Sequence, residues 1–303
     1  MLRLGLCCLF KNESIVFHTT TAKSISKYSS VERLEKLSDL CLGNAESLFK
    51  AIEYCVLNKI GCFRVSSRIF PLKTHPDFGY KIDDLKDYEK INNVFIKCRK
   101  TAEKFDIRLT FHPDQFVVLS SPDILVVKKS IQELEYQAQI SESIGADVIN
   151  IHAGGVYGDK KSALGRLAIV LSTLDSSIRR RLTLENDDRS YTPSDLLPFC
   201  KKNKVPFVYD IHHHRCLTDD LSIENTTKLA LETWDREPLF HMSSPKYGFE
   251  DKKCRNHSDY ISIEDFPLCW KKLDITVEIE AKAKELAVKK IRKQINKEFF
   301  NEV

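Results

Sequence analysis

Eight short apolar segments alternate with longer amphipathic segments along the chain, and this alternation constrains the fold more than any other feature. The eight segments are Leu2–Cys7, Cys62–Ser66, Ile107–Phe111, Val148–His152, Leu182–Glu185, Pro206–Asp210, Leu239–Met242 and Ile275–Glu280. Most of them are nearly continuous in apolar character, which is typical of strands buried on both faces. We therefore predict eight buried strands.

Helical patterns separate the predicted strands. Asn44–Asn58 and Leu85–Phe105 carry apolar side chains at helical spacing, and Ser130–Ile144 follows a helix-start sequence at 121–123. Thr192-Pro193 is typical of an N-cap followed by proline in the first helical position. The alternation predicts one α/β domain over residues 1–303, a (β/α)8 TIM barrel. An open doubly wound sheet is the alternative, but its G-x-G-x-x-G turn is absent from the sequence.

Two further segments carry expectations of their own. Lys11–Gly43 is the longest insertion between a predicted strand and its helix, and long loops of this kind lie at the catalytic face of barrels. The Lys-rich segment 282–303 favours a terminal helix, which we interpret as solvated rather than as a dedicated DNA contact.

Composition sets only broad limits. The net charge of +4 and the pI near 8.4 fit a polyanionic partner without requiring one. The 10 cysteines include no C-x-x-C pair, so we expect reduced, buried thiols. No apolar stretch reaches the roughly 18 residues that a membrane span needs. We expect a soluble cytoplasmic monomer without a membrane partner, associated with the nucleoid in a bacterium.

Histidine and carboxylate side chains stand at the end of every predicted strand from the third to the eighth. They are His112, His152, Glu185, Asp210 with His212, His213 and His214, His241, and Glu278 with Glu280. The C-terminal strand ends of a parallel barrel converge on one face. A lone histidine there is more often hydrogen-bonded within the fold, but six consecutive strand ends predict a shared site. These residue types bind Zn²⁺ or Mn²⁺, and two or three such ions can hold both oxygens of a phosphodiester displacement.

Two choices of ligand stay open on the residues alone. The strand is expected to end before His212, so strand periodicity cannot select the ligand among the three consecutive histidines. Glu278 and Glu280 share one face of the last strand, and Glu280 is the better candidate because it lies nearer the C-terminal end.

The motifs at these strand ends resemble, in order, those of the UV-damage endonuclease family over residues 1 to about 285. The matching pieces are Arg64-Val65-Ser66-Ser67, Thr74-His75-Pro76, Phe111-His112-Pro113-Asp114-Gln115-Phe116, Asn150-Ile151-His152, Leu184-Glu185-Asn186-Asp187-Asp188, Asp210 with His213-His214, His241 with Ser243-Ser244-Pro245-Lys246, His257-Ser258-Asp259-Tyr260, and Glu280-Ala281-Lys282. The resemblance implies a barrel similar to endonuclease IV and a cluster of up to three divalent ions, Mn²⁺ with Zn²⁺ as the alternative. It implies a nick immediately 5′ to cyclobutane pyrimidine dimers, 6-4 photoproducts and abasic sites in double-stranded DNA.

The resemblance also assigns roles to residues. The implied metal ligands are His112, His152, Glu185, Asp210, His213, His241, His257 and Glu280. Glu185 would be the bridging, catalytic carboxylate, and His75 matches a further active-site histidine. Gln115 and Phe116 match the pair that the family inserts at the lesion, and Asn12, Arg64 and Lys246 are candidate DNA contacts.

The chain departs from many relatives at three positions. Phe116 stands where many carry tyrosine, Leu239 stands where some carry a lysine near the metals, and Leu6 stands where some carry a lesion-contacting tyrosine. Three rival functions remain: a general abasic-site endonuclease, a metal-dependent sugar isomerase or epimerase, and a non-catalytic damage-binding protein. The Gln115-Phe116 pair and the basic charge balance favour DNA.

Overall fold

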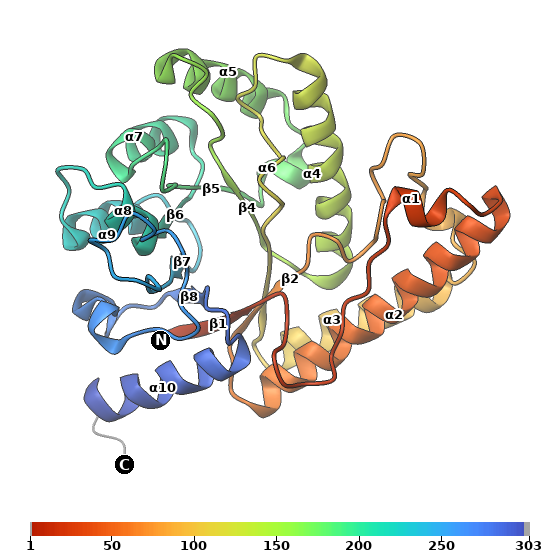
Figure 1. Ribbon diagram of the computed structural model, residues 1–303, viewed down its shortest axis with the longest axis horizontal. Coiled ribbons are helices and arrows are strands. Elements are labelled where there is room, and N and C mark those ends of the chain that lie inside the picture. Colours follow the sequence, from red (N-terminus) through yellow and green to blue (C-terminus); the bar gives the residue numbers. More distant parts are fainter. Residues whose placement is uncertain (1, 300–303) are drawn as a thin grey trace.

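The predicted strands close into a barrel. The structure is a computed structural model that describes residues 2–299, and within this range eight parallel strands form one closed barrel in sequence order (Figure 1). They are β1 (Arg3–Cys7), β2 (Cys62–Val65), β3 (Arg108–Phe111), β4 (Val148–His152), β5 (Leu182–Glu185), β6 (Phe207–Asp210), β7 (Leu239–Met242) and β8 (Thr276–Ile279). The TIM-barrel prediction is confirmed, and each predicted strand end lies within one residue of the observed one.

Helices surround the barrel and cover the outward faces of the strands (Figure 1). They are α1 (Ala22–Ile25), α2 (Ser30–Leu57), α3 (Tyr88–Lys104), α4 (Ile124–Ile144), α5 (Lys160–Thr173), α6 (Ser176–Arg179), α7 (Pro193–Asn203), α8 (Ile211–Cys216), α9 (Ile223–Leu231) and α10 (Glu285–Phe299), with short 3₁₀ turns η1 (Ile82–Asp84), η2 (Ile263–Asp265) and η3 (Leu268–Trp270). The predicted start of α7 is confirmed: Pro193 is its first residue, and Thr192 N–H donates to the Asp195 carboxylate at 2.9 Å.

The strands direct aliphatic and aromatic side chains outward, whereas their inward rows carry polar side chains together with a small aliphatic cluster of Val148, Val208 and Leu239. In β7, Phe240 packs against Trp270 of η3 with ring centroids 5.1 Å apart, whereas the next residue, His241, points to the barrel axis, where it meets Glu278 of β8. Because side chains alternate along a strand, the inward row of β8 is Thr276 and Glu278. The barrel interior therefore carries polar groups below the C-terminal strand ends.

The segment expected as a long insertion at 11–43 is largely helical. A capping box begins α2, in which Ser29 N–H donates to the Glu32 carboxylate at 2.9 Å, and the buried stripe then continues through Leu37 and Cys41. The loop after β1 therefore ends at residue 29, and α2 packs beside α3 along one side of the barrel (Figure 1). The S-x-x-E pattern at Ser29 is the signal that identifies this helix start.

Two other helix boundaries also differ from the sequence expectation. Helix α4 begins at Ile124, six residues before the helical pattern at Ser130 but directly after the predicted helix-start sequence at 121–123, because the Asp123 carboxylate caps it by accepting Leu125 N–H at 2.8 Å. The expected terminal helix is present as α10 from residue 285, and the part expected at 300–303 lies outside the described residues. Buried Glu285 accepts the backbone N–H groups of Lys11 and Asn12 at 2.7 and 2.8 Å, which ties the loop after β1 to α10.

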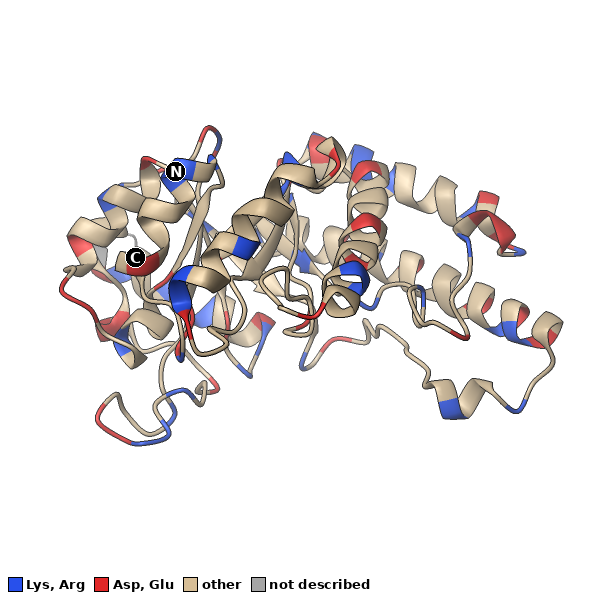
Figure 2. Cartoon of the chain, turned by 90° about the horizontal axis from the view of Figure 1, so that it is seen from above, with Lys and Arg blue, Asp and Glu red and all other residues tan. Residues whose placement is uncertain are grey.

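Charges and thiols are distributed without a single dominant patch. Figure 2 shows lysine and arginine interspersed with aspartate and glutamate over helices and loops. All 10 cysteines lie in the described range as free thiols, six of them buried and four half-buried. Among the described residues, no helix has the length and apolarity needed to cross a bilayer.

Candidate metal centre

Glu185, the last residue of β5, lies at the centre of the converging strand ends. Its Oε2 is 2.9 Å from Nε2 of His112, and its Oε1 is 3.1 Å from Nδ1 of His241 and 3.3 Å from Nδ1 of His213. The side chain is fully buried. The structure thus brings residues from β5, β7, the loop after β3 and helix α8 after β6 around one carboxylate, as the strand-end argument predicts.

Two compact groups of potential ligands share Glu185. One contains His112, His152 and Glu185, and the other contains Glu185, Asp210 and His213, with the donor atoms of each group within 4.8 Å of one another. A carboxylate common to two groups is placed where a bridging ligand is needed.

Four atoms in this cluster lack hydrogen-bond partners. His152 Nδ1, Glu185 Oε1, Asp210 Oδ2 and His241 Nδ1 are buried and have no hydrogen-bond partner among the residues that the structure describes. Each buried, unpaired polar group costs about 1–3 kcal/mol. Imidazole nitrogens and carboxylate oxygens that converge without donors between them fit divalent cations, so the residues present suit a metal cluster.

Burial and mutual charge set the protonation of the cluster. Burial opposes ionisation of Glu185, but the neighbouring His241 and His152 and the close contacts with His112 and His213 lower its pKa well below the usual range. Burial also opposes charge on His241, yet Glu185 raises its pKa to about 10. Burial lowers the pKa of His152 to about 4. The site therefore favours an ionised central carboxylate beside both neutral and charged imidazoles.

The three consecutive histidines have three different environments. His213 forms a potential ligand group with Glu185 and Asp210. The His212 ring instead packs edge-on against the His257 ring, with ring centroids 4.9 Å apart. His214 contacts the Tyr209 hydroxyl at 2.7 Å and Asp219 at 3.0 Å. The chain turns into α8 directly after Asp210, so helical rather than strand geometry selects His213.

His257 and Glu280 lie at the edge of the cluster. Glu280 Oε1 is 3.6 Å from Nδ1 of His241, and its Oε2 is 3.8 Å from Nδ1 of His257. A short antiparallel bridge joins Pro245 and His257 within the loop after β7. Among residues 2–299, Glu280 and His257 lie near the centre of the cluster but belong to neither of the two compact ligand groups.

Arg64 is placed differently from the expected DNA contact. Its side chain projects from β2 into the barrel, is 7% exposed, and donates to Glu278 at 2.5 Å and to Glu280 at 2.6 Å. Because β2 directs residue 64 inward, its guanidinium pairs with the carboxylates of β8. Arg64 is therefore paired inside the barrel rather than exposed towards a phosphate.

His75, Asn12 and Lys246 lie on loops away from the central carboxylate. His75 Nδ1 accepts Asp77 N–H at 3.1 Å, and the two ligand groups found in the described range do not include it. Asn12 is exposed on the loop after β1. Lys246 is exposed on the loop after β7, where its backbone N–H donates to Asn256 at 2.7 Å.

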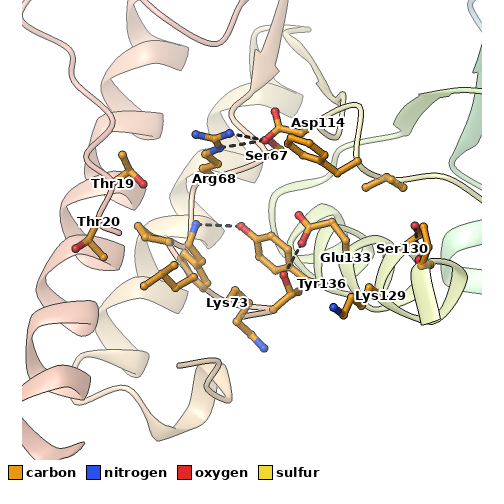
Figure 3. A pocket seen from close by; sticks show the side chains of 17 residues that line it. Thr19, Thr20, Ser67, Arg68, Lys73, Asp114, Lys129, Ser130, Glu133 and Tyr136 are labelled. Carbon is orange, nitrogen blue, oxygen red and sulfur yellow. Dashed lines mark hydrogen bonds and ion pairs between the residues drawn. The ribbon is translucent and has the colours of Figure 1, made fainter. Parts of the chain in front are cut away.

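Gln115 and Phe116 occupy the loop between β3 and α4 and face two different cavities. Phe116 is 74% exposed and lines a cavity of about 560 Å³, whose wall carries the ion pair of Arg68 with Asp114 and the hydrogen bond of Thr74 to Glu133 (Figure 3). Gln115 lines a second cavity of about 440 Å³ that also contains His152 and His213. The loop therefore separates the candidate metal centre from a largely apolar hollow.

Sequence reasoning missed the polar residues below the ligands. Asn150 donates its amide to Glu185 Oε2 and accepts the Thr183 hydroxyl at 2.9 Å. Asn150 lies two residues before His152 on the same face of β4, which is the signal that could have identified it. Leu239, at the position where some relatives carry lysine, instead packs with Val148 and Val208.

A parallel barrel with a buried ligand cluster at its C-terminal strand ends defines a TIM-barrel protein with a candidate metal centre. Residues 2–302 match the model of a family described as UV-endonuclease UvdE. The UV DNA damage endonuclease of Bacillus velezensis is 34% identical over 293 residues, which cover 92% of this chain and 88% of that protein. The chain therefore belongs to the UV-endonuclease UvdE family, a family of endonucleases.

Solved structures agree with this assignment. The crystal structure of SacUVDE has a TM-score of 0.87 at 27% identity, with 100% of each chain covered. Endonuclease IV from Thermus thermophilus shares the fold, with a TM-score of 0.58 at 13% identity over 97% of each chain. The family resemblance inferred from the strand-end motifs is confirmed.

Proposed function

We propose that this protein is a DNA-repair endonuclease that cuts double-stranded DNA immediately 5′ to UV lesions. The proposed substrates are cyclobutane pyrimidine dimers, 6-4 photoproducts and abasic sites, and the proposed products carry 3′-hydroxyl and 5′-phosphate ends. Family membership supports the endonuclease activity. The observation that carries the metal-dependent mechanism is the convergence of four buried, unpaired ligand atoms around Glu185.

The proposed metal ligands are those implied by the family resemblance, with Glu185 as the bridge. They are His112, His152, Glu185, Asp210, His213, His241, His257 and Glu280. A divalent cluster held there, Mn²⁺ with Zn²⁺ as the alternative, would neutralise charge that develops on the phosphodiester and lower the pKa of the attacking water. The protein's own contribution is a rigid donor set: Asn150 fixes Glu185, and Asp210 is fixed at the start of α8.

Lesion recognition is proposed to depend on the loop between β3 and α4. An exposed phenyl ring such as that of Phe116 can enter a weakened base step, and Gln115 lies beside the cavity that reaches His152 and His213. Damaged pairs unstack at lower cost than intact pairs, and this difference would select chemically different lesions. The pair directly follows His112-Pro113-Asp114, so insertion at the lesion would bring the neighbouring phosphodiester towards the metal ligands.

Three loop residues complete the proposed interface. Lys246 would contact a backbone phosphate, since it lies exposed on the loop that carries His257. Asn12 would approach the lesion from the loop after β1. His75 is proposed to act on the substrate rather than as a ligand, because its contacts lie within its own loop. We propose that the protein acts as a cytoplasmic monomer.

Nicking of supercoiled plasmid tests this function and separates it from its rival. Purified protein is incubated with UV-irradiated, partly depurinated and untreated plasmid in the presence of Mn²⁺, and again after chelation. The proposal predicts chelator-sensitive nicking of irradiated plasmid and little nicking of untreated plasmid. Nicking of depurinated plasmid alone would support the general abasic-site endonuclease instead. Lesion binding without nicking would support a non-catalytic damage-binding protein.

A further inference from the structure

Helix α10 carries a local concentration of positive charge beside the loop after β7. The helix packs against β1 (Figure 1) and buries Val288, Ile291 and Ile295 on its inner side. Its other side forms one wall of an open hollow of about 580 Å³, which we call the lysine groove and which is lined by Tyr260, Leu286, Lys289, Lys290, Lys293 and Gln294. Among the described residues no carboxylate lines the lysine groove, so it holds three positive charges and no negative one.

Aromatic rings hold two of these lysine side chains in place. The ammonium group of Lys289 lies 4.9 Å from the ring centroid of Tyr54 on α2, and that of Lys290 lies 4.7 Å from the ring centroid of Tyr260. A ring face attracts the ammonium without removing its charge or using its N–H donors. Lys289 and Lys290 can therefore still donate to an anion in the lysine groove, as can the exposed Lys293.

An arginine-rich hollow at the other end of the barrel shows the contrast. It lies at the start of β4 and β5, away from the metal centre, and four arginines line it together with Glu142 and Asp147. Glu142 pairs with Arg180, and Asp147 pairs with Arg236. Positive charge in that hollow is balanced by neighbouring carboxylates, whereas the lysine groove offers its charge to a partner.

The lysine groove adjoins two of the proposed metal ligands. Two backbone hydrogen bonds, of 3.1 and 2.9 Å, join residues 282–283 to residues 258–259. The first segment begins two residues after Glu280, and the second directly follows His257 and leads to Tyr260. The groove is therefore attached to the rim of the candidate metal centre, and DNA that occupies the centre passes close to it.

The lysine groove and the proposed wedge lie on opposite sides of the metal centre. Phe116 follows β3, whereas Tyr260 follows β7, and these two strands are four apart in the closed barrel of eight. The ligands around Glu185 lie between the two loops, at the converging strand ends. With the lesion at Phe116 and the cut bond at the metal centre, the duplex beyond the cut extends over the lysine groove.

We propose that the lysine groove binds the DNA backbone on the 5′ side of the incision, through Lys289, Lys290 and Lys293. Such contacts are made to phosphates, so they position the duplex and do not read the base sequence or the lesion. The inference rests on the proposed function and deepens it, because it names the flank of the substrate that the protein holds. It gives α10 a DNA contact in place of the solvated role that its sequence suggests.

The salt dependence of binding tests these contacts. The substrate is a dimer-containing duplex in Mn²⁺, with an uncleaved methylphosphonate at the expected cut. The groove variant is Lys289→Gln/Lys290→Gln/Lys293→Gln, and the matched control is Lys100→Gln/Lys104→Gln/Lys202→Gln. The control lysines are exposed near the ends of α3 and α7 that precede β3 and β6, at the opposite end of the barrel from the strand ends that carry the metal centre.

Each lost phosphate contact lowers the slope of log K against log salt concentration by about 0.9, so the slope of the groove variant should be shallower by roughly 2–3. The control variant should keep the slope of the parent protein. An unchanged slope in the groove variant, or an equal change in the control, would overturn the proposal. If the triple variant does not fold, the exposed Lys290 and Lys293 are replaced alone, with an expected change of roughly 2.

Shortening the duplex locates the contact. Removal of base pairs from the end that lies 5′ to the dimer in the damaged strand should abolish the difference in affinity between the parent and the groove variant. Removal of base pairs from the 3′ end should leave that difference unchanged. A difference that depends on the 3′ arm instead would overturn the proposal.

Single-turnover incision at saturating protein and low salt separates the lysine groove from the metal centre. The groove variant should cut at the rate of the parent protein, because its lysines bind the flank and not the cleaved bond. A slower rate at saturation would assign their effect to the metal centre and overturn the proposal. Incision by the parent with unchanged salt slopes would overturn this inference alone. Absence of both lesion binding and incision by the parent would overturn the proposed function together with it.

Discussion

Asp210 uses its two carboxylate oxygens for two different tasks towards His213. Oδ1 accepts the backbone N–H of His213 at 2.8 Å and so caps α8, while Oδ2 lies 3.6 Å from the His213 ring and has no hydrogen-bond partner among the described residues. One side chain thereby begins the helix that carries His213 and offers a ligand atom beside that histidine. Capping a helix and offering a ligand atom are therefore compatible tasks for this one side chain.

This division of tasks predicts different outcomes for two substitutions. Asp210→Asn keeps an oxygen for the cap but exchanges a carboxylate ligand for a neutral amide. We expect nearly unchanged stability and at least a tenfold weaker affinity for Mn²⁺. Asp210→Ala should lose the cap as well, at a cost of about 0.5–2 kcal/mol in the free energy of unfolding. Urea denaturation and metal titration measure the two effects separately. Equal Mn²⁺ affinity in Asp210→Asn and the parent would remove Asp210 from the ligand set.

Phe116→Ala should reduce incision without reducing stability. The ring is 74% exposed, so little packing is lost, whereas stacking of an aromatic side chain on a base contributes about 1–3 kcal/mol. We therefore expect roughly a tenfold or larger drop in kcat/KM on a duplex that contains one cyclobutane dimer. Phe116→Tyr should retain activity. Leu57→Ala, which truncates an 82% exposed side chain at the end of α2, is the matched control. Normal incision by Phe116→Ala would contradict the proposed wedge.

His75→Ala should separate catalysis from metal binding. Because His75 contacts Asp77 and Phe78 of its own loop, its loss should leave the affinity for Mn²⁺ within about twofold while kcat for incision falls. Chelator competition and single-turnover incision provide the two measurements. A parallel loss of metal affinity would instead make His75 a ligand.

Asp219 predicts an acid-dependent loss of stability away from the metal centre. Burial opposes its ionisation, but backbone N–H groups of Ser194 and Leu221 at 2.7 and 2.9 Å lower its pKa below the usual value. A depressed pKa in the folded state stabilises the protein above the unfolded-state pKa of about 3.9, and this contribution is lost as the pH falls through the folded-state pKa. Asp219→Asn should therefore be less stable than the parent at pH 7, by about 1–2 kcal/mol. The difference should shrink below about pH 4, as measured by urea denaturation at each pH.

The barrel and its central ligands were predictable because both depend on local sequence. Buried parallel strands are continuous apolar runs, and a residue such as Glu185 at a strand end is directed to the shared face by strand geometry alone. The choice of His213 needed the helix start at Asp210, a boundary that strand periodicity does not reveal. The role of Arg64 depended on which strands become neighbours: β2 and β8 both flank β1, which brings residues 64 and 278 together across 214 positions of sequence.

The long helix α2 shows a different cause of error. Its capping box at Ser29 and Glu32 is a local signal, but the stronger apolar stripe that begins near residue 44 places the predicted helix start too late. The sequence does not single out the polar residues Asn150 and Thr183 below the ligands, for a physical reason. Their contacts with Glu185 and with each other form only when β4 and β5 become neighbours in the barrel.

Incision of one defined substrate tests the central claim most directly. A 5′-labelled duplex with a single cyclobutane dimer is incubated with the parent protein and with Glu185→Gln, in Mn²⁺ and after chelation. The account predicts one product that ends in a 3′-hydroxyl immediately 5′ to the dimer, formed by the parent protein in Mn²⁺ and abolished by chelation or by Glu185→Gln. Equal cutting by Glu185→Gln, or cutting that persists after chelation, would contradict a metal centre organised around Glu185.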